Sequence, residues 1–207
     1  MELLEIFSGT KYVGKVAEQL GYEVISLDLK DADINCNILD WDYTIYPPNY
    51  FAIIWASPPC DTFSILRKCW TGRYGHTVET MQNDINDIGL PILRRTEEII
   101  DYFKPEYYFI ENPQTGRMKE YIDKPYYDVD YCKYADWGYR KRTRVWTNLI
   151  GFIPRMCNKD CNSMVGTKHL KNISRATEEH VNRQSVRHRI PPALIEELFN
   201  CMDLDLR

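Results

Sequence analysis

A thiol and a carboxyl group each follow a short apolar run in this chain. Residues 51–56 are apolar and rich in β-forming types, and Pro58-Pro59-Cys60 comes after them; residues 107–110 are followed by Glu111-Asn112. Such runs are typical of strands buried on both faces of a parallel sheet, and prolines end a strand and stiffen the turn. Because ligands bind at the carboxyl ends of such strands, we expect Cys60 and Glu111 to face one cleft. A buried cysteine with a purely structural role is the alternative for Cys60.

Another group of polar residues follows the first strands that the sequence predicts. Residues 2–7 form an apolar run, Ser8-Gly9-Thr10 turns it, and residues 13–20 have helical spacing. A nucleotide-type cofactor site begins with such a strand, glycine turn and helix. Asp28 ends the next apolar run, where an acid accepts hydrogen bonds from ribose hydroxyls, although a solvated strand-end aspartate has the same position. Asn37, near a third strand end, could contact an adenine ring.

Positive charge is concentrated in the last third of the chain. Residues 133–189 hold 13 Lys and Arg against 4 Asp and Glu, whereas residues 1–132 hold 12 against 22. Within the basic part, alternation along a predicted strand puts Arg140, Arg142 and Arg144 on one face. A basic surface of this kind is typical of a protein that binds a polyanion, and an ordinary solvated face is the alternative.

Two cysteines in the basic part have the spacing of metal ligands. Cys157 and Cys161 are four residues apart and His169 follows, so these three could ligate zinc. No fourth ligand stands at a diagnostic spacing, and the candidates for that position are Cys132, His180 and His188. A loop that happens to contain two thiols is the alternative.

The length and composition limit the class of protein. The chain has 207 residues, 44% of them hydrophobic, which suits one domain with a sizeable core, alone or with a small appendage. No apolar run reaches the length of a membrane span, and the acidic start does not resemble a secretory leader. Seven scattered cysteines, an odd number, favour a reducing compartment. We therefore expect a protein that is not secreted and works in the cytoplasm or nucleus.

Several short motifs occur together in an order that is specific for one family. They are Phe7-Ser8-Gly9, Asp28, Pro58-Pro59-Cys60, Glu111-Asn112 and Arg142-x-Arg144. In this order they resemble the DNA cytosine-5 methyltransferases, above all the short members from phages and large DNA viruses. The resemblance spans residues 3–148, and Arg189-Ile190-Pro191-Pro192 looks like the closing motif of the family.

The resemblance implies an architecture. It implies the Rossmann-like α/β fold of S-adenosylmethionine-dependent methyltransferases, with a mixed, mostly parallel sheet and helices on both faces. Residues 1–148 would form the catalytic core. Residues 149–188 would be a small basic segment in place of the large target-recognition region of the family. Residues 189–207 would form a C-terminal helix that packs back on the core.

The resemblance also implies a role for each motif. The Cys60 thiolate would add to carbon 6 of a cytosine flipped out of duplex DNA, after its pKa is lowered by a helix N-terminus or a nearby cation. Glu111 would act at ring nitrogen 3, Arg144 with Arg142 would bind the carbonyl at carbon 2, and Asn112 would shape the loop. S-adenosylmethionine would lie against Phe7, Ser8, Gly9, Thr10, Asp28, Asn37 and Pro58.

Some residues depart from the family pattern. Lys11 stands where a small residue is usual, Asn37 where an aspartate is usual, and Arg140 where a glutamine is usual. A lysine beside a sulfonium cofactor would either point outward or impair cofactor binding. Two further functions therefore stay open beside DNA methylation. One is methylation of cytosine in RNA, and the other is nucleic-acid binding by a catalytically impaired relative.

Overall fold

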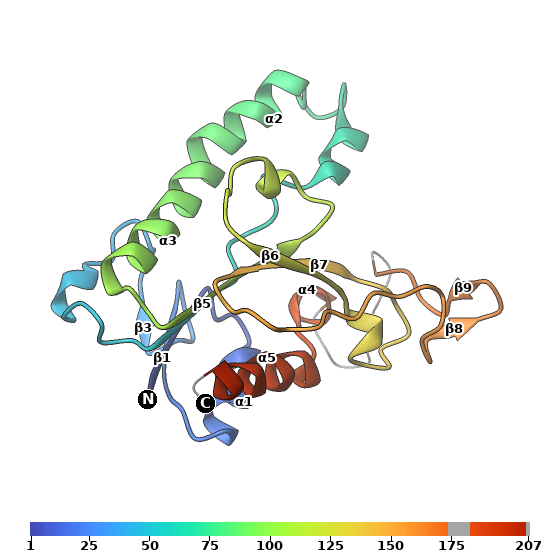
Figure 1. Cartoon of the computed structure of the whole chain (residues 1–207). Coiled ribbons are helices and arrows are strands. Elements are labelled where there is room, and N and C mark those ends of the chain that lie inside the picture. The colour runs from blue at the N-terminus through green and yellow to red at the C-terminus, as the bar shows by residue number, and fades with distance from the viewer. Residues whose placement is uncertain (174–182, 206–207) are drawn as a thin grey trace.

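The protein folds as an α/β sandwich around one large sheet (Figure 1). The structure is a computed structural model, and it describes residues 1–173 and 183–205. The strands of the large sheet are β1 (Glu2–Ile6), β2 (Glu23–Asp28), β3 (Ile34–Asn35), β4 (Ile53–Ala56), β5 (Tyr107–Pro113), β6 (Tyr126–Asp130) and β7 (Arg142–Thr147). The helices are α1 (Tyr12–Gln19), α2 (Val78–Asp84), α3 (Leu90–Phe103), α4 (Arg183–His188) and α5 (Pro192–Asp205).

The strand order is β3-β2-β1-β4-β5-β7-β6. The pairs β3–β2, β2–β1, β1–β4 and β4–β5 are parallel, and β7 is antiparallel to both of its neighbours. This mixed, mostly parallel sheet confirms the fold class that the motifs implied. The order reverses between β1 and β4, so their carboxyl ends lie at the point where open α/β sheets bind ligands.

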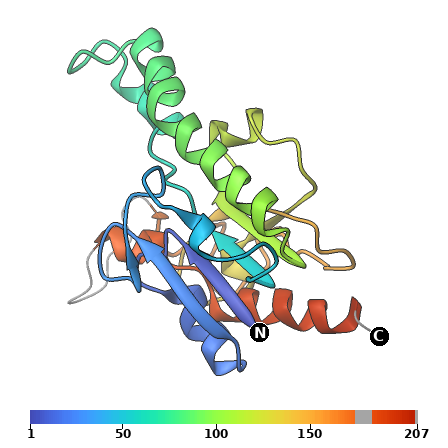
Figure 2. The ribbon, with the colours of Figure 1, turned by 90° about the vertical axis from the view of Figure 1, so that its left-hand side faces the viewer.

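Helices cover both faces of the sheet, as predicted (Figures 1 and 2). On one face α1 and α5 pack on alternate strand residues, among them Leu3, Trp55 and Phe109. On the other face α3 packs on the intervening residues, such as Ile54 and Ile110. Every side chain of β4 is therefore buried, which explains its continuous apolar run.

Three regions differ from a plain alternation of strands and helices. A π-helical turn, Ile85–Gly89, joins α2 to α3, and in Figure 2 the resulting long rod projects beyond the sheet. The segment after β7 forms a small hairpin of β8 (Met164–Val165) and β9 (Lys168–His169). The chain then returns through α4, and α5 packs beside α1. None of the helices in the described part of the chain is long and apolar enough to cross a membrane.

Candidate active site

The thiol and the carboxyl group lie at neighbouring strand ends. β4 pairs with β5 so that Ala56 is opposite Ile110, which puts Cys60 and Glu111 just beyond the same edge. The Asn112 side chain joins the two ends, because its Nδ2 donates to the carbonyl oxygen of Pro58 (2.8 Å). Asn112 is 1% exposed, so this hydrogen bond is shielded from water and fixes the turn that carries Cys60.

Two side chains that the motifs did not predict hold the Glu111 carboxylate. The Tyr131 hydroxyl donates to Glu111 Oε1 (2.9 Å), and the Lys141 ammonium lies 3.5 Å from the same oxygen. Lys141 also lies over the Tyr131 ring, 4.7 Å from its centroid. Burial and the nearby Glu111 carboxylate raise the pKa of Tyr131 well above its usual range, so the hydroxyl keeps its proton and acts as a donor.

Cys60 is half-buried, and its surroundings keep the thiol protonated. Burial raises the pKa of Cys60, and the carboxylates of Asp61 and Glu111 raise it further. Lys141 is the cation that lowers this pKa. We expected the pKa of the Cys60 thiol to be lowered, and in this structure it is raised instead. Lys141 is nevertheless a cation that favours the thiolate form of Cys60.

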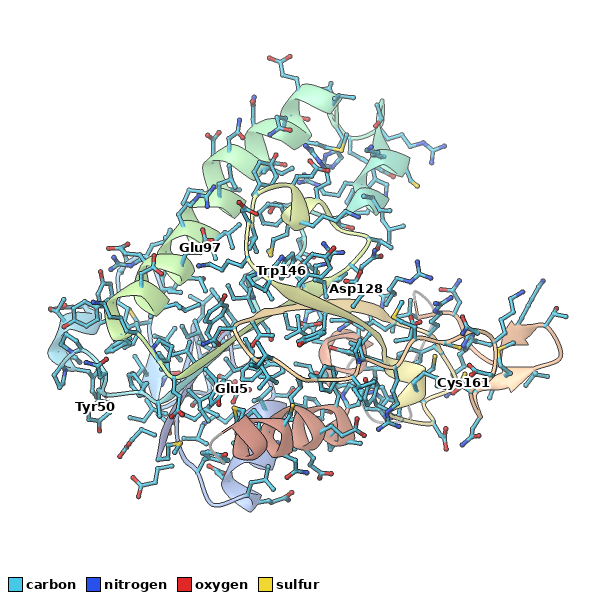
Figure 3. The ribbon with its side chains drawn as sticks, in the orientation of Figure 1. Glu5, Tyr50, Glu97, Asp128, Trp146 and Cys161 are labelled. Atoms are coloured by element: carbon cyan, nitrogen blue, oxygen red, sulfur yellow. The ribbon has the colours of Figure 1, made fainter. Side chains whose placement is uncertain are left out.

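Arg142 and Arg144 of β7 contact acids of β6 instead of Glu111, and so does Arg140, which lies before the strand and not in it as predicted. The register of β5 on β7 puts Glu111 opposite Val145 and Asn112 opposite Arg144, so Arg144 lies on the other face of the sheet from Glu111. Arg144 forms two hydrogen bonds with Asp128, at 2.7 and 2.8 Å, beside the β6–β7 pair in Figure 3.

The buried carboxylate of Asp130 binds the other two arginines. Arg140 forms two hydrogen bonds with it, and Arg142 lies 3.8 Å away. All three arginines contact Asp128 or Asp130 of β6, which agrees with the prediction that they share one face. The function assigned to Arg142 and Arg144 stays a prediction.

The predicted cofactor edge contains an open turn with an unused polar group. Phe7 and Gly9 have positive φ angles of 61° and 50°, and nothing lies within 4 Å of the place of a Cβ on Gly9. The Gly9 amide donates to Asp28 Oδ2 (2.8 Å), which ties this turn to the end of β2. Within residues 1–173 and 183–205, the buried Ser8 hydroxyl has no hydrogen-bond partner, and Thr10 is exposed. A buried hydroxyl beside a backbone turn without side-chain bulk fits a small polar ligand such as S-adenosylmethionine.

A buried carboxyl group holds the start of α1, which follows this turn. Glu5 accepts hydrogen bonds from the amides of Val13 (3.3 Å) and Gly14 (3.0 Å) at the start of α1. A Cβ on Gly14 would lie 2.6 Å from Glu5 Oε2, so only glycine leaves room for the carboxylate. Burial, the dominant cause, raises the pKa of Glu5 to about 7 although both amides and Lys11 oppose the shift.

The two departures in the cofactor region have partners. The Lys11 ammonium lies 3.8 Å from Asp33 Oδ2, so its charge is offset by a carboxylate. Asn37 is exposed, and its Oδ1 accepts the amide of Leu39 (3.1 Å) in a local turn. Neither contact blocks the Ser8-Gly9 turn.

The predicted metal ligands come together with a fourth residue. Cys157, Cys161 and His169 meet Cys132, and the four potential ligand atoms lie within 4.8 Å of one another. This group could hold a metal ion. His188, at the end of α4, is not part of this group, and its pKa is lowered, first by burial and then by the Lys141 charge. His180 is outside the described residues.

Known proteins resemble this chain in sequence and in fold. The chain is 44% identical over 217 aligned residues to a protein of Frog virus 3 (isolate Goorha) named probable DNA (cytosine-5)-methyltransferase, and the match covers 97% of this chain and 99% of the viral protein. No profile of a protein family matches.

A solved structure of low identity shares the fold. The Entamoeba histolytica methyltransferase EhMeth is 16% identical with a TM-score of 0.53 over 88% of this chain. A Spodoptera frugiperda DNMT2 mutant is 17% identical with a TM-score of 0.47 over 87%. The chain spans 61% and 60% of the lengths of these two proteins. The near-complete match to the viral protein, together with the order of the motifs along the sheet, shows that the chain belongs to the DNA (cytosine-5)-methyltransferase family.

Proposed function

We propose that the protein transfers a methyl group from S-adenosylmethionine to carbon 5 of cytosine in DNA through a covalent adduct on Cys60. The observation that carries this proposal is the joining of Cys60 and Glu111 at one sheet edge by the hydrogen bond from Asn112 to Pro58. The viral relative, whose name describes this activity, supports it. A protein that only bound nucleic acid would need neither the thiol nor the carboxyl group.

The chain would supply the groups that make cytosine a nucleophile. Cys60 loses its proton to water and its sulfur bonds to carbon 6, so the electrons of the 5,6 double bond become available at carbon 5. Glu111 stabilises this form by a hydrogen bond or proton transfer at ring nitrogen 3. S-adenosylmethionine supplies the methyl group. A base then removes the proton on carbon 5, the 5,6 double bond forms again, and the Cys60 thiolate leaves.

Lys141 completes this group of residues. Its ammonium lies against Glu111 and lowers the pKa of Cys60, so it would stabilise the thiolate at the moment of attack. We keep Arg144 and Arg142 as the groups for the carbonyl at carbon 2. That role requires Arg144 to exchange the carboxylate of Asp128 for the base.

The methyl donor would bind at the edge formed by β1, β2 and β4. The unpartnered Ser8 hydroxyl and the open face of Gly9 would contact its polar end, and Asp28 would accept from its ribose. Phe7, Thr10, Asn37 and Pro58 would complete this site.

Duplex DNA is the proposed substrate. The target base has to leave the helix to reach Cys60. We propose that residues 149–188 contact the DNA in place of a larger recognition region. All seven cysteines are free, which suits a reducing compartment of the host cell such as the cytoplasm or nucleus.

The test measures transfer of tritiated methyl groups from S-adenosylmethionine to unmethylated duplex DNA and, in parallel, to tRNA. We expect incorporation into DNA that yields 5-methylcytosine on digestion and disappears in Cys60→Ala. Incorporation into tRNA alone would replace DNA by RNA as the substrate. An active Cys60→Ala protein would contradict the covalent mechanism.

A further inference from the structure

We propose that Cys132, Cys157, Cys161 and His169 bind one Zn²⁺ ion, which fastens the segment after β7 to the end of β6. These residues come from separate places in the chain. Cys132 belongs to a helical turn after β6, Cys157 and Cys161 to a loop, and His169 to β9. In Figure 3 Cys161 lies beside the small hairpin, away from the α1 and α5 helices.

The distances fit a tetrahedral metal site. His169 Nε2 lies 3.6 Å from Cys157 Sγ and 3.4 Å from Cys161 Sγ. Metal–sulfur bonds of about 2.3 Å and metal–nitrogen bonds of about 2.0–2.1 Å at tetrahedral angles give a sulfur–nitrogen separation of about 3.6 Å. No disulfide removes the thiols, because all of the cysteines are free. The two distances from His169 therefore match a zinc tetrahedron, and all four ligand atoms lie within 4.8 Å of one another.

The donor set selects zinc and a structural role. Three sulfurs and one imidazole suit zinc, whereas calcium and magnesium require oxygen ligands. With four protein ligands the site has no open position for a substrate, and catalytic zinc sites keep one. Cys132 and Cys157 are 3% and 4% exposed, so the ion would be closed off from water on that side.

The surroundings hold the ligands in place. The amide of Cys157 donates to the buried carboxylate of Asp130 (2.8 Å), and Lys159 between the two loop cysteines has a positive φ of 67° that turns the loop back. Lys133 binds Asp160 of the same loop (3.0 Å).

The metal would give the small hairpin its stability. β8 and β9 have two residues each, which is too little for a hairpin to persist without further support. Binding a structural zinc ion supplies folding free energy directly. The residue before Cys132 is Tyr131, whose hydroxyl holds Glu111, so the zinc site would also fix the end of β6 next to the proposed catalytic acid.

Metal analysis of the full chain, purified without a chelator, tests the site. We expect about one zinc ion per chain and, after replacement by Co²⁺, the sulfur-to-cobalt charge-transfer absorption of thiolate ligation. Cys161→Ser should weaken zinc binding about tenfold or more in competition with a chromophoric chelator. Cys69→Ser is the matched control, because Cys69 is exposed and outside the cluster, and it should bind zinc like the parent.

Hydrogen exchange tests the role of the metal. Removal of zinc should speed exchange of the amides in residues 157–170 and leave those of β1 and β4 unchanged. A purified chain with only traces of zinc and no cobalt absorption, or a Cys161→Ser protein that keeps its zinc, would overturn the site. Equal exchange of residues 157–170 with and without the metal would overturn the fastening role. None of these readouts requires methyl transfer, so they stand apart from a failure of the proposed enzyme activity.

Discussion

Glu5 should make the protein less stable as the pH rises. Its pKa is about 7 in the folded state and 4.5 is the ordinary value, so between these values the folded chain holds a proton that the unfolded chain has lost. Unfolding then releases a proton, and stability falls with increasing pH. A pKa difference of about 2.5 corresponds to about 3 kcal/mol in total, of which about 2.5 kcal/mol is lost between pH 5 and pH 8.

Urea unfolding of the parent and of Glu5→Gln at pH 5, 6, 7 and 8 measures this effect. Other titrating groups are common to both proteins, so the difference in unfolding free energy between them isolates Glu5. We expect the parent to lose about 2.5 kcal/mol relative to Glu5→Gln over this range. Glu23→Gln, at an exposed glutamate of β2, is the control for the removal of one carboxyl group outside the core. A difference for Glu5→Gln that does not change with pH would refute the assignment of a buried, protonated carboxyl group.

Further predictions concern the thiol and carboxyl site. Lys141→Met should shift the pH midpoint of Cys60 alkylation to higher pH, because the cation that lowers the thiol pKa is gone. Peptide mass spectrometry measures the alkylation of Cys60, and Lys141→Arg should restore the midpoint. An unchanged midpoint in Lys141→Met would show that Lys141 does not act on the thiol. Glu111→Gln should slow methyl transfer about 10²-fold or more with the fold intact by circular dichroism, and an unchanged rate would exclude proton transfer by Glu111. Asn112→Ala should lower kcat about tenfold or more with KM for S-adenosylmethionine nearly unchanged, since it frees the Pro58 carbonyl and loosens the turn. A change in KM alone would place the role of Asn112 at the cofactor.

The main sheet could be predicted because its strands have strong local signals. β4 is buried on both faces and so is apolar at every position, and the prolines after it mark its end. The glycine at position 14 of α1 also has a physical cause, since the carboxyl group of Glu5 fills the space that a side chain there would need. The hairpin of β8 and β9 could not be predicted, because two-residue strands carry no periodic pattern.

The alternation in the basic strand was predictable, but its register was not. Alternation places Lys141 on one face and Arg142 and Arg144 on the other, and only the pairing of Glu111 with Val145 decides which face meets the carboxyl group. A shift of one residue would exchange the two sets. Long-range pairing sets that register, and the local sequence holds no information about it.

Three consecutive residues at the end of β6 explain why the rest of the site escaped prediction. Asp130 binds Arg140 and the amide of Cys157, Tyr131 binds Glu111, and Cys132 joins the cysteine and histidine cluster. Each partner is at least ten residues away in the chain, so no spacing rule could find the contacts of Asp130 and Tyr131 or choose Cys132 among the three candidates for the fourth ligand. Because the three side chains lie on one continuous backbone, a displacement at the cluster moves the group that holds Glu111. Residues 130–132 therefore connect the segment after β7 to the proposed catalytic acid. We expect removal of the proposed zinc ion to disturb the hydrogen bond from Tyr131 to Glu111.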